Sequence, residues 1–241
     1  MATAKTGIVL LGGVGMTARH LAKICSTLYP HLASATPSRA HARQHSVVQL
    51  VNANGFPALE DRLRRSLDEF SGGCIVHSVS GSAFFATAAL AKWKDERVRG
   101  VIFDSIPQLR LEAPLLRLLG VPTPLLAPAS ALARAVLVSP LFNATLQYTD
   151  NYSELIRKPA VFGPRVLYAH SSEDEVVPMQ QFSDFCKDLK AGQGSSSWGS
   201  TRVDLYVGKG KHAAMARDDA GFAAAVKAFL ADSGCFAPGE V

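Results

Sequence analysis

Residues 74–85 read "CIVHSVSGSAFF" and carry the most informative pattern in this chain. An apolar run ends in three serines on alternate positions, Ser78, Ser80 and Ser82, with Gly81 between the last two. A nucleophile elbow, usually G-x-S-x-G, presents its central serine on a sharp turn between a strand and a helix. The alternative is a serine-rich turn that caps a helix, because serine is a favoured N-cap residue. This stretch alone leaves both interpretations open.

On both sides of this stretch, short apolar runs alternate with segments of helical spacing. We expect strands at 8–11, 47–51, 74–77, 98–103, 166–169 and 203–207. We expect helices at 17–28, 58–70, 82–94, 179–189 and 220–230. This alternation predicts an α/β fold with a mostly parallel, doubly wound sheet. In such sheets the ligand site lies at the carboxyl ends of the strands, so the loops after each strand hold the candidate residues.

One α/β domain is expected over residues 1–241, with an insertion at about 108–150 after the fourth predicted strand. A membrane-spanning helix needs about 20 consecutive apolar residues. Three prolines and two arginines interrupt the apolar insertion, at Pro122, Pro124, Pro128, Arg117 and Arg134. We therefore expect an apolar cap over the site, and association with a membrane surface stays open as an alternative.

Composition excludes several function classes. The 25 basic and 20 acidic residues give a net charge of +5, but they are scattered, so no nucleic-acid partner is expected. The 4 cysteines form no CxxC pair, and no histidine lies at metal-ligand spacing, so we expect reduced thiols, no metal and a cytoplasmic location. The start of the chain carries an apolar core too short for a secretory signal.

The loop "LLGGVGMTA" after the first predicted strand fits the dinucleotide pattern G-x-G-x-x-A through Gly13, Gly15 and Ala18. That pattern also requires an acidic residue at the end of the second strand, where this chain has none. A nucleotide cofactor is therefore not favoured, and no cofactor is expected. The same loop can instead direct amides at a developing oxyanion, so Gly81 with Gly13 or Val14 is the predicted oxyanion hole.

A serine hydroxyl becomes nucleophilic only beside a base that an acid orients. In α/β-hydrolases the chain order is serine, acid, histidine. Here "SSEDEVVP" places Asp174 after the fifth strand and "GKGKHAAM" places His212 after the sixth. The predicted catalytic triad is Ser80, Asp174 and His212, and Asp104 in "VIFDS" is the reserve acid. Structural roles are expected for the histidines at His20, His77 and His170.

The sequence as a whole resembles a eukaryotic family of unknown function that includes transmembrane protein 53 and the fungal PaxU-like proteins of indole-diterpene biosynthesis. The resemblance rests on "IVLLGG", "RHLAK", "VHSVSGSAFF", "GVIFDSIP", "LYAHSSEDEVVP" and "VDLYVGKGKHAAM". It implies an α/β-hydrolase fold with a triad at Ser80, Asp174 and His212, and it implies no substrate. The family's elbow typically reads S-N-G-G, so a serine at Ser82 adds bulk where the turn is crowded.

The expected activity is acyl transfer from an ester, lactone or thioester of a hydrophobic small molecule, and the PaxU-like resemblance points to secondary metabolism. Two alternatives stay open. The same pocket can promote cyclisation or isomerisation of a biosynthetic intermediate without hydrolysis. A hydrolase fold can also serve as a binding protein without catalysis, because fold does not fix function.

Overall fold

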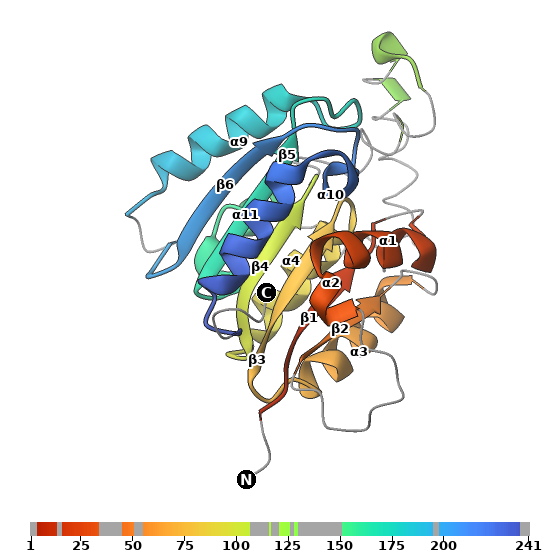
Figure 1. Ribbon diagram of the computed structural model, residues 1–241. Coiled ribbons are helices and arrows are strands. Elements are labelled where there is room, and N and C mark those ends of the chain that lie inside the picture. Colours follow the sequence, from red (N-terminus) through yellow and green to blue (C-terminus); the bar gives the residue numbers. More distant parts are fainter. Residues whose placement is uncertain are drawn as a thin grey trace.

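The structure is a computed structural model, and it describes residues 4–13, 16–33, 45–50, 55–106, 116, 121–125, 128–129, 151–194 and 198–236. Six parallel strands form one sheet in the order β2-β1-β3-β4-β5-β6 (Figure 1). The strands are β1 (Thr6–Leu11), β2 (His45–Leu50), β3 (Gly73–Val79), β4 (Val98–Asp104), β5 (Arg165–Ser171) and β6 (Arg202–Gly208). The predicted parallel sheet is confirmed.

Helices follow the strands and cover both faces of the sheet. The longer helices are α1 (Ala18–Leu28), α3 (Gly55–Asp68), α4 (Ser82–Trp93), α9 (Met179–Ala191) and α11 (Ala220–Ala231). The short helices and helical turns are α2 (Pro30–Ala33), η1 (Thr123–Leu125), α8 (Tyr152–Leu155), η2 (Pro159–Phe162) and α10 (Met215–Asp218). In Figure 1, α1, α2 and α11 lie over one face of the sheet, and α3 and α4 lie behind it.

Two hydrophobic clusters form the core, one on each face of the sheet. Along β1, Val9 and Leu11 pack into the cluster under α3, α4 and α9, whereas Ile8 and Leu10 pack into the cluster under α1 and α11. Strands buried on both faces read as continuous apolar runs, because successive side chains point to opposite sides. This explains why β1 was recognisable from sequence as an unbroken apolar run.

The strand before Ser80 is longer than the sequence predicts. The sequence predicts this strand at 74–77, but β3 runs from Gly73 to Val79 and so gains Gly73, Ser78 and Val79. Ser78 is buried, and its hydroxyl lies 2.8 Å from that of Ser82. Apolar patterning ends a strand at such a residue, because a polar side chain whose hydrogen bond is formed inside the fold leaves no apolar signal. Ser78 and Val79 bring the strand to the turn that presents Ser80.

The cap expected at about 108–150 lies outside the described residues apart from short pieces at 116, 121–125 and 128–129. The single domain over 1–241 likewise stays a prediction. A search of the described residues for a membrane-spanning helix found none of sufficient length and hydropathy.

Candidate active site

Ser80 lies in the turn between β3 and α4, and its backbone adopts φ +54°. That left-handed conformation costs a non-glycine residue about 1–3 kcal/mol and persists only where its surroundings hold it. Two backbone bonds hold this turn: the Ser80 N–H donates to the Asp104 carbonyl at 2.7 Å, and the Ala83 N–H donates to the Ser80 carbonyl at 3.0 Å. The half-buried Ser80 side chain therefore stands at the carboxyl end of β3, as the elbow motif predicts.

Gly13 packs directly against this turn. A Cβ atom at Gly13 would lie 2.8 Å from the Cβ of Ser80, 2.8 Å from the carbonyl oxygen of Val79 and 3.3 Å from the amide nitrogen of Gly81. Backbone and a Cβ atom cannot move aside as the end of a flexible side chain can. Glycine is therefore required at this position by close packing of the loop after β1 against the elbow.

Ser82 does not crowd the elbow, contrary to the expectation from sequence. Its buried hydroxyl lies 2.8 Å from the Ser78 hydroxyl, 2.9 Å from the Val79 carbonyl and 3.1 Å from the Leu11 carbonyl. These acceptors belong to β3 and to the neighbouring β1. The serines two before and two after Ser80 thus form a hydrogen-bonded pair that ties the elbow to both strands.

The strain at Ser80 predicts that Ser80→Gly raises the free energy of unfolding by about 1 kcal/mol. Glycine adopts positive φ freely, so the substitution removes the strain. Glycine also loses more backbone entropy on folding than serine does, which offsets part of this gain. Ser80→Ala is the matched control, because alanine keeps the Cβ atom and the strain. Urea denaturation measures both, and equal stability of the two variants would contradict a strained elbow.

The structure brings the three predicted catalytic residues together. The Ser80 hydroxyl oxygen lies 2.6 Å from Nε2 of His212, and Nδ1 of His212 lies 2.7 Å from Oδ2 of Asp174. The three residues come from the loops after β3, β6 and β5, which meet at one edge of the parallel sheet. Two short hydrogen bonds thus connect the Ser80 hydroxyl to the His212 imidazole and the imidazole to the Asp174 carboxylate.

Asp174 is held in place by its own loop. Its Oδ1 accepts hydrogen bonds from the N–H groups of Val176 and Val177, each at 2.9 Å, which leaves Oδ2 for His212. The carboxylate is buried, so both oxygens need such partners. The sequence "DEVVP" therefore fixes the orientation of the acid as well as supplying it.

His170 contacts the same loop. Its ring stacks on Phe182 and its Nε2 donates to the Val177 carbonyl at 2.9 Å. Burial lowers the pKa of His170, so its imidazole stays neutral around pH 7. The structural role expected for His170 is confirmed, as it is for His20, whose Nδ1 accepts from the Thr17 N–H at 3.0 Å and caps α1.

Hydrogen bonds also join the acid loop to the histidine loop. The Gly210 N–H donates to Oε2 of Glu173 at 3.0 Å, and the Ser171 hydroxyl donates to the Gly210 carbonyl. The Ser172 hydroxyl donates to the Gly208 carbonyl at 3.0 Å. Sequence reasoning missed these three side chains, although a polar run directly after a buried strand was a visible signal. They fix the loops after β5 and β6 relative to each other.

Asp104, the predicted reserve acid, belongs to a different hydrogen-bond network. It is fully buried, and its Oδ1 accepts from the Ser105 hydroxyl at 2.8 Å. Its Oδ2 lies 3.8 Å from Nε2 of His77, whose Nδ1 bonds the Tyr29 hydroxyl at 2.6 Å. Burial, reinforced by the charge of Asp104, raises the pKa of Tyr29, so Tyr29 stays protonated and can donate to His77. His77 is buried in a structural network, as expected.

This network reaches His212 only indirectly. The Ser105 hydroxyl oxygen accepts from the N–H of Ala213 at 3.2 Å, and Ala213 directly follows His212 in the chain. Ala213 and Ser105 both adopt positive φ, at +55° each. Asp104 therefore supports the backbone of the histidine loop, whereas Asp174 contacts the imidazole itself.

The predicted oxyanion donors have different environments. Among the described residues, the N–H of Gly81 at the start of α4 has no acceptor, and a helix N-terminus favours negative charge. The Gly13 N–H lies 3.2 Å from the sulfur of Met16, a weak acceptor. Val14 lies outside the described residues. The described ranges contain no cluster of three or more His, Cys, Asp or Glu side chains that could hold a metal ion.

Several solved structures have a fold similar to that of this protein. The structure is similar to a serine hydrolase involved in carbazole degradation (16% identity, TM-score 0.55, covering 95% of this chain and 92% of that chain). It is also similar to an esterase from Pyrococcus furiosus (15% identity, TM-score 0.58, coverage 95% and 82%). A third similar structure is the thioesterase domain from the curacin biosynthetic pathway (11% identity, TM-score 0.54, coverage 93% and 91%).

The protein has the α/β-hydrolase fold. No protein-family model matches the sequence, and no curated protein matches it. Similarity at these identities establishes the architecture, and an α/β-hydrolase is expected to carry its serine, acid and histidine at the strand ends where Ser80, Asp174 and His212 lie.

Proposed function

We propose that this protein is a serine hydrolase that transfers the acyl group of an ester, lactone or thioester to water. The observation that carries the proposal is the 2.6 Å contact between the Ser80 hydroxyl and Nε2 of His212, with Asp174 bonded to Nδ1 on the other side. A serine next to a base is a nucleophile, and a base oriented by a carboxylate can take its proton.

In the first half-reaction the Ser80 oxygen attacks the carbonyl carbon while its proton passes to Nε2 of His212. Asp174 holds the ring in the tautomer with a proton on Nδ1 and stabilises the imidazolium that forms. The carbon–leaving-group bond then breaks, and His212 gives the proton to the departing oxygen or sulfur. Ser80 is left as an acyl ester.

In the second half-reaction water replaces the leaving group. His212 takes a proton from the water as it attacks the acyl ester, and returns that proton to the Ser80 oxygen when the acid leaves. In both halves the negative charge on the carbonyl oxygen needs preorganised donors. We assign one donor to the Gly81 N–H and propose Val14 or Gly13 for the second.

The contact between Ser80 and His212 favours this chemistry over acid–base catalysis of cyclisation or isomerisation, which would not require a hydroxyl at that place. It also disfavours a role as a binding protein, because binding alone does not require a serine hydroxyl next to an imidazole that a carboxylate orients. The substrate is proposed to be a hydrophobic small molecule, on the strength of the apolar segment 108–150.

Membership of the family with transmembrane protein 53 and the PaxU-like proteins, and a role in secondary metabolism, are part of this proposal. They rest on the sequence motifs around Ser80, Asp174 and His212. A cytoplasmic location is also proposed, because all 4 cysteines are free thiols, as is usual in a reducing compartment.

The experiment is hydrolysis of p-nitrophenyl octanoate, followed by release of p-nitrophenol, with the wild type and an otherwise identical Ser80→Ala chain. The proposal expects wild-type turnover that the variant lacks. Equal rates from both chains would place the chemistry elsewhere, and absence of turnover with any acyl ester or thioester would remove the hydrolase assignment.

A further inference from the structure

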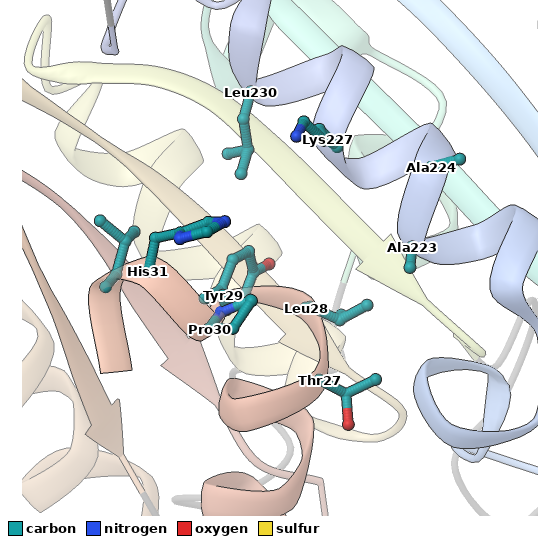
Figure 2. Close-up of a pocket in the computed structure, with 10 residues that line it drawn as sticks. Thr27, Leu28, Tyr29, Pro30, His31, Ala223, Ala224, Lys227 and Leu230 are labelled. Atoms are coloured by element: carbon teal, nitrogen blue, oxygen red, sulfur yellow. The ribbon is translucent and has the colours of Figure 1, made fainter. Parts of the chain in front are cut away.

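Two neighbouring cavities lie between α1 and the C-terminal helices, on the face of the sheet that α1 and α11 cover. The first, of about 90 Å³, lies between α1 and α10, and the second, of about 220 Å³, lies between the α1–α2 junction and α11 (Figure 2). Both are lined by Thr27, so they adjoin each other. We call the two cavities together the α1–α11 groove.

The groove begins beside the proposed catalytic residues. Its first cavity is lined by Ala213, which directly follows His212, and by Met16, whose sulfur lies 3.2 Å from the Gly13 N–H. From there it follows α1 past Thr27 to Leu230 on α11. His20 to Thr27 alone spans about 10 Å at the 1.5 Å rise per residue of a helix. The groove is therefore long and starts on the histidine side of the site.

Positively charged side chains line both cavities, and none of the described residues that line them is acidic. The charged lining residues are Lys23 and Arg217 in the first cavity and Lys227 in the second, and the imidazoles of His20 and His31 also line the groove. In Figure 2, His31 and Lys227 come from opposite walls, α2 and α11. Among the described residues, neither lysine has an ion-pair partner.

One nearby carboxylate only partly offsets this charge. Asp218 accepts a hydrogen bond from Nη2 of Arg217 at 2.6 Å. The pKa of Asp218 is lowered by that bond first, and also by the charges of Lys23 and Lys211. Three cations therefore surround a single carboxylate at the near end of the groove, which leaves net positive charge there.

The floor of the groove is apolar. Leu28, Tyr29 and Leu230 line the second cavity and are almost fully buried, and Ile24 lines the first. An apolar floor between cationic walls fits a ligand with a long, weakly polar chain and anionic groups. It does not fit a free inorganic phosphate, which would leave the apolar floor uncovered.

We propose that the α1–α11 groove binds the leaving group of an acyl thioester, a pantetheine-type arm that carries phosphates, as in an acyl-coenzyme A. This rests on the proposed function, because His212 protonates the leaving group and Ala213, which directly follows His212, lines the first cavity. The thioester carbon–sulfur bond breaks, water supplies the oxygen of the acid, and the arm departs as a free thiol. Lys23 and Lys227 would bind its phosphates as point charges.

The test compares octanoyl-coenzyme A with p-nitrophenyl octanoate, which has the same acyl group and no phosphate. In the double variant Lys23→Glu/Lys227→Glu, the ratio of kcat/KM for the thioester to kcat/KM for the ester is expected to fall at least about tenfold. Lys190→Glu is the matched control, an exposed lysine of α9 that lines neither cavity, and its ratio stays within about twofold. An unchanged ratio in the double variant overturns the inference.

Two further measurements test whether the phosphates of the leaving group contribute to binding, and whether the groove proposal can fail independently of the proposed hydrolase function. Wild-type kcat/KM for octanoyl-coenzyme A is expected to exceed that for octanoyl-pantetheine, which lacks the phosphates, and equality overturns the role of the groove charges. Calorimetry then measures binding of coenzyme A to Ser80→Ala. If coenzyme A binds and the substitutions Lys23→Glu/Lys227→Glu abolish this binding, the proposed role of the groove is supported even if no ester is hydrolysed. If the protein hydrolyses p-nitrophenyl octanoate but does not bind coenzyme A, the proposed role of the groove is overturned and the proposed hydrolase function stands.

Discussion

The Ser80→Ala variant is expected to hydrolyse p-nitrophenyl octanoate with a kcat at least about 10⁴-fold below that of the wild type. Alanine removes the hydroxyl that lies 2.6 Å from Nε2 of His212, so no acyl ester can form. The residual rate comes from the oxyanion donors and from substrate binding alone. Steady-state kinetics with the purified protein measures the loss. A second, independent preparation checks that the residual rate does not come from a contaminating enzyme.

Residues that act as one unit give losses that do not add. His212→Ala is therefore expected to lower kcat about as much as Ser80→Ala, and the double variant about as much as either single variant. Circular dichroism controls for folding, because neither side chain belongs to the hydrophobic core. Additive losses, or a Ser80→Ala variant that keeps a tenth of the wild-type rate, would contradict a shared nucleophile and base.

The Asp174→Asn variant is expected to lose about 10⁴-fold in kcat, because an amide cannot hold His212 in the required tautomer or stabilise its imidazolium. Its Oδ1 bonds to the Val176 and Val177 amides can be kept by the asparagine carbonyl, so the loop should stay folded. The same ester assay measures the effect, and the melting temperature checks the fold.

Asp104→Asn is the matched control for the acid. Asp104 bonds Ser105 and lies 3.8 Å from Nε2 of His77, and it reaches the histidine loop only through Ser105 and the Ala213 N–H. We expect less than about a tenfold loss of kcat, because asparagine can still accept from the Ser105 hydroxyl. If Asp104→Asn abolished turnover and Asp174→Asn did not, the assignment of the acid would be reversed.

The fold and the positions of the proposed catalytic residues were predictable from sequence for one physical reason. Parallel strands carry their carboxyl ends to the same edge of a sheet, so residues just after β3, β5 and β6 converge even though they are far apart in the chain. Ser80, Asp174 and His212 each follow an apolar run directly enough for this rule to find them. The Ser80–His212 distance confirms that they meet.

The choice between two acids was harder to predict. Asp104 and Asp174 both follow buried strands, and the sequence around them gives no sign of which carboxylate faces the imidazole. Only the side-chain contacts separate them, with Asp174 bonded to His212 and Asp104 bonded to Ser105. Chain order within α/β-hydrolases favoured Asp174, which is the carboxylate that bonds His212, but that argument comes from the fold family and not from local physics.

The polar run after β5 was visible in the sequence, but the partners of its side chains were not. The Gly210 N–H donates to Glu173 across 37 residues of sequence, and the Tyr29 hydroxyl bonds His77 across 48. Hydrogen bonds between residues so far apart leave no periodic pattern, and the sequence does not show whether a serine such as Ser82 crowds the turn or stabilises it. Its hydrogen bonds to Ser78 and to the strand carbonyls decide that question.

The most direct measurement of the central claim is covalent labelling with an alkyl fluorophosphonate, located by peptide mass spectrometry. In the wild type we expect one phosphonate on Ser80, since only a hydroxyl next to a base displaces fluoride rapidly. We expect none in Ser80→Ala and at least about a hundredfold slower labelling in His212→Ala. A label on another serine, or labelling of Ser80 at an equal rate without His212, would contradict the account.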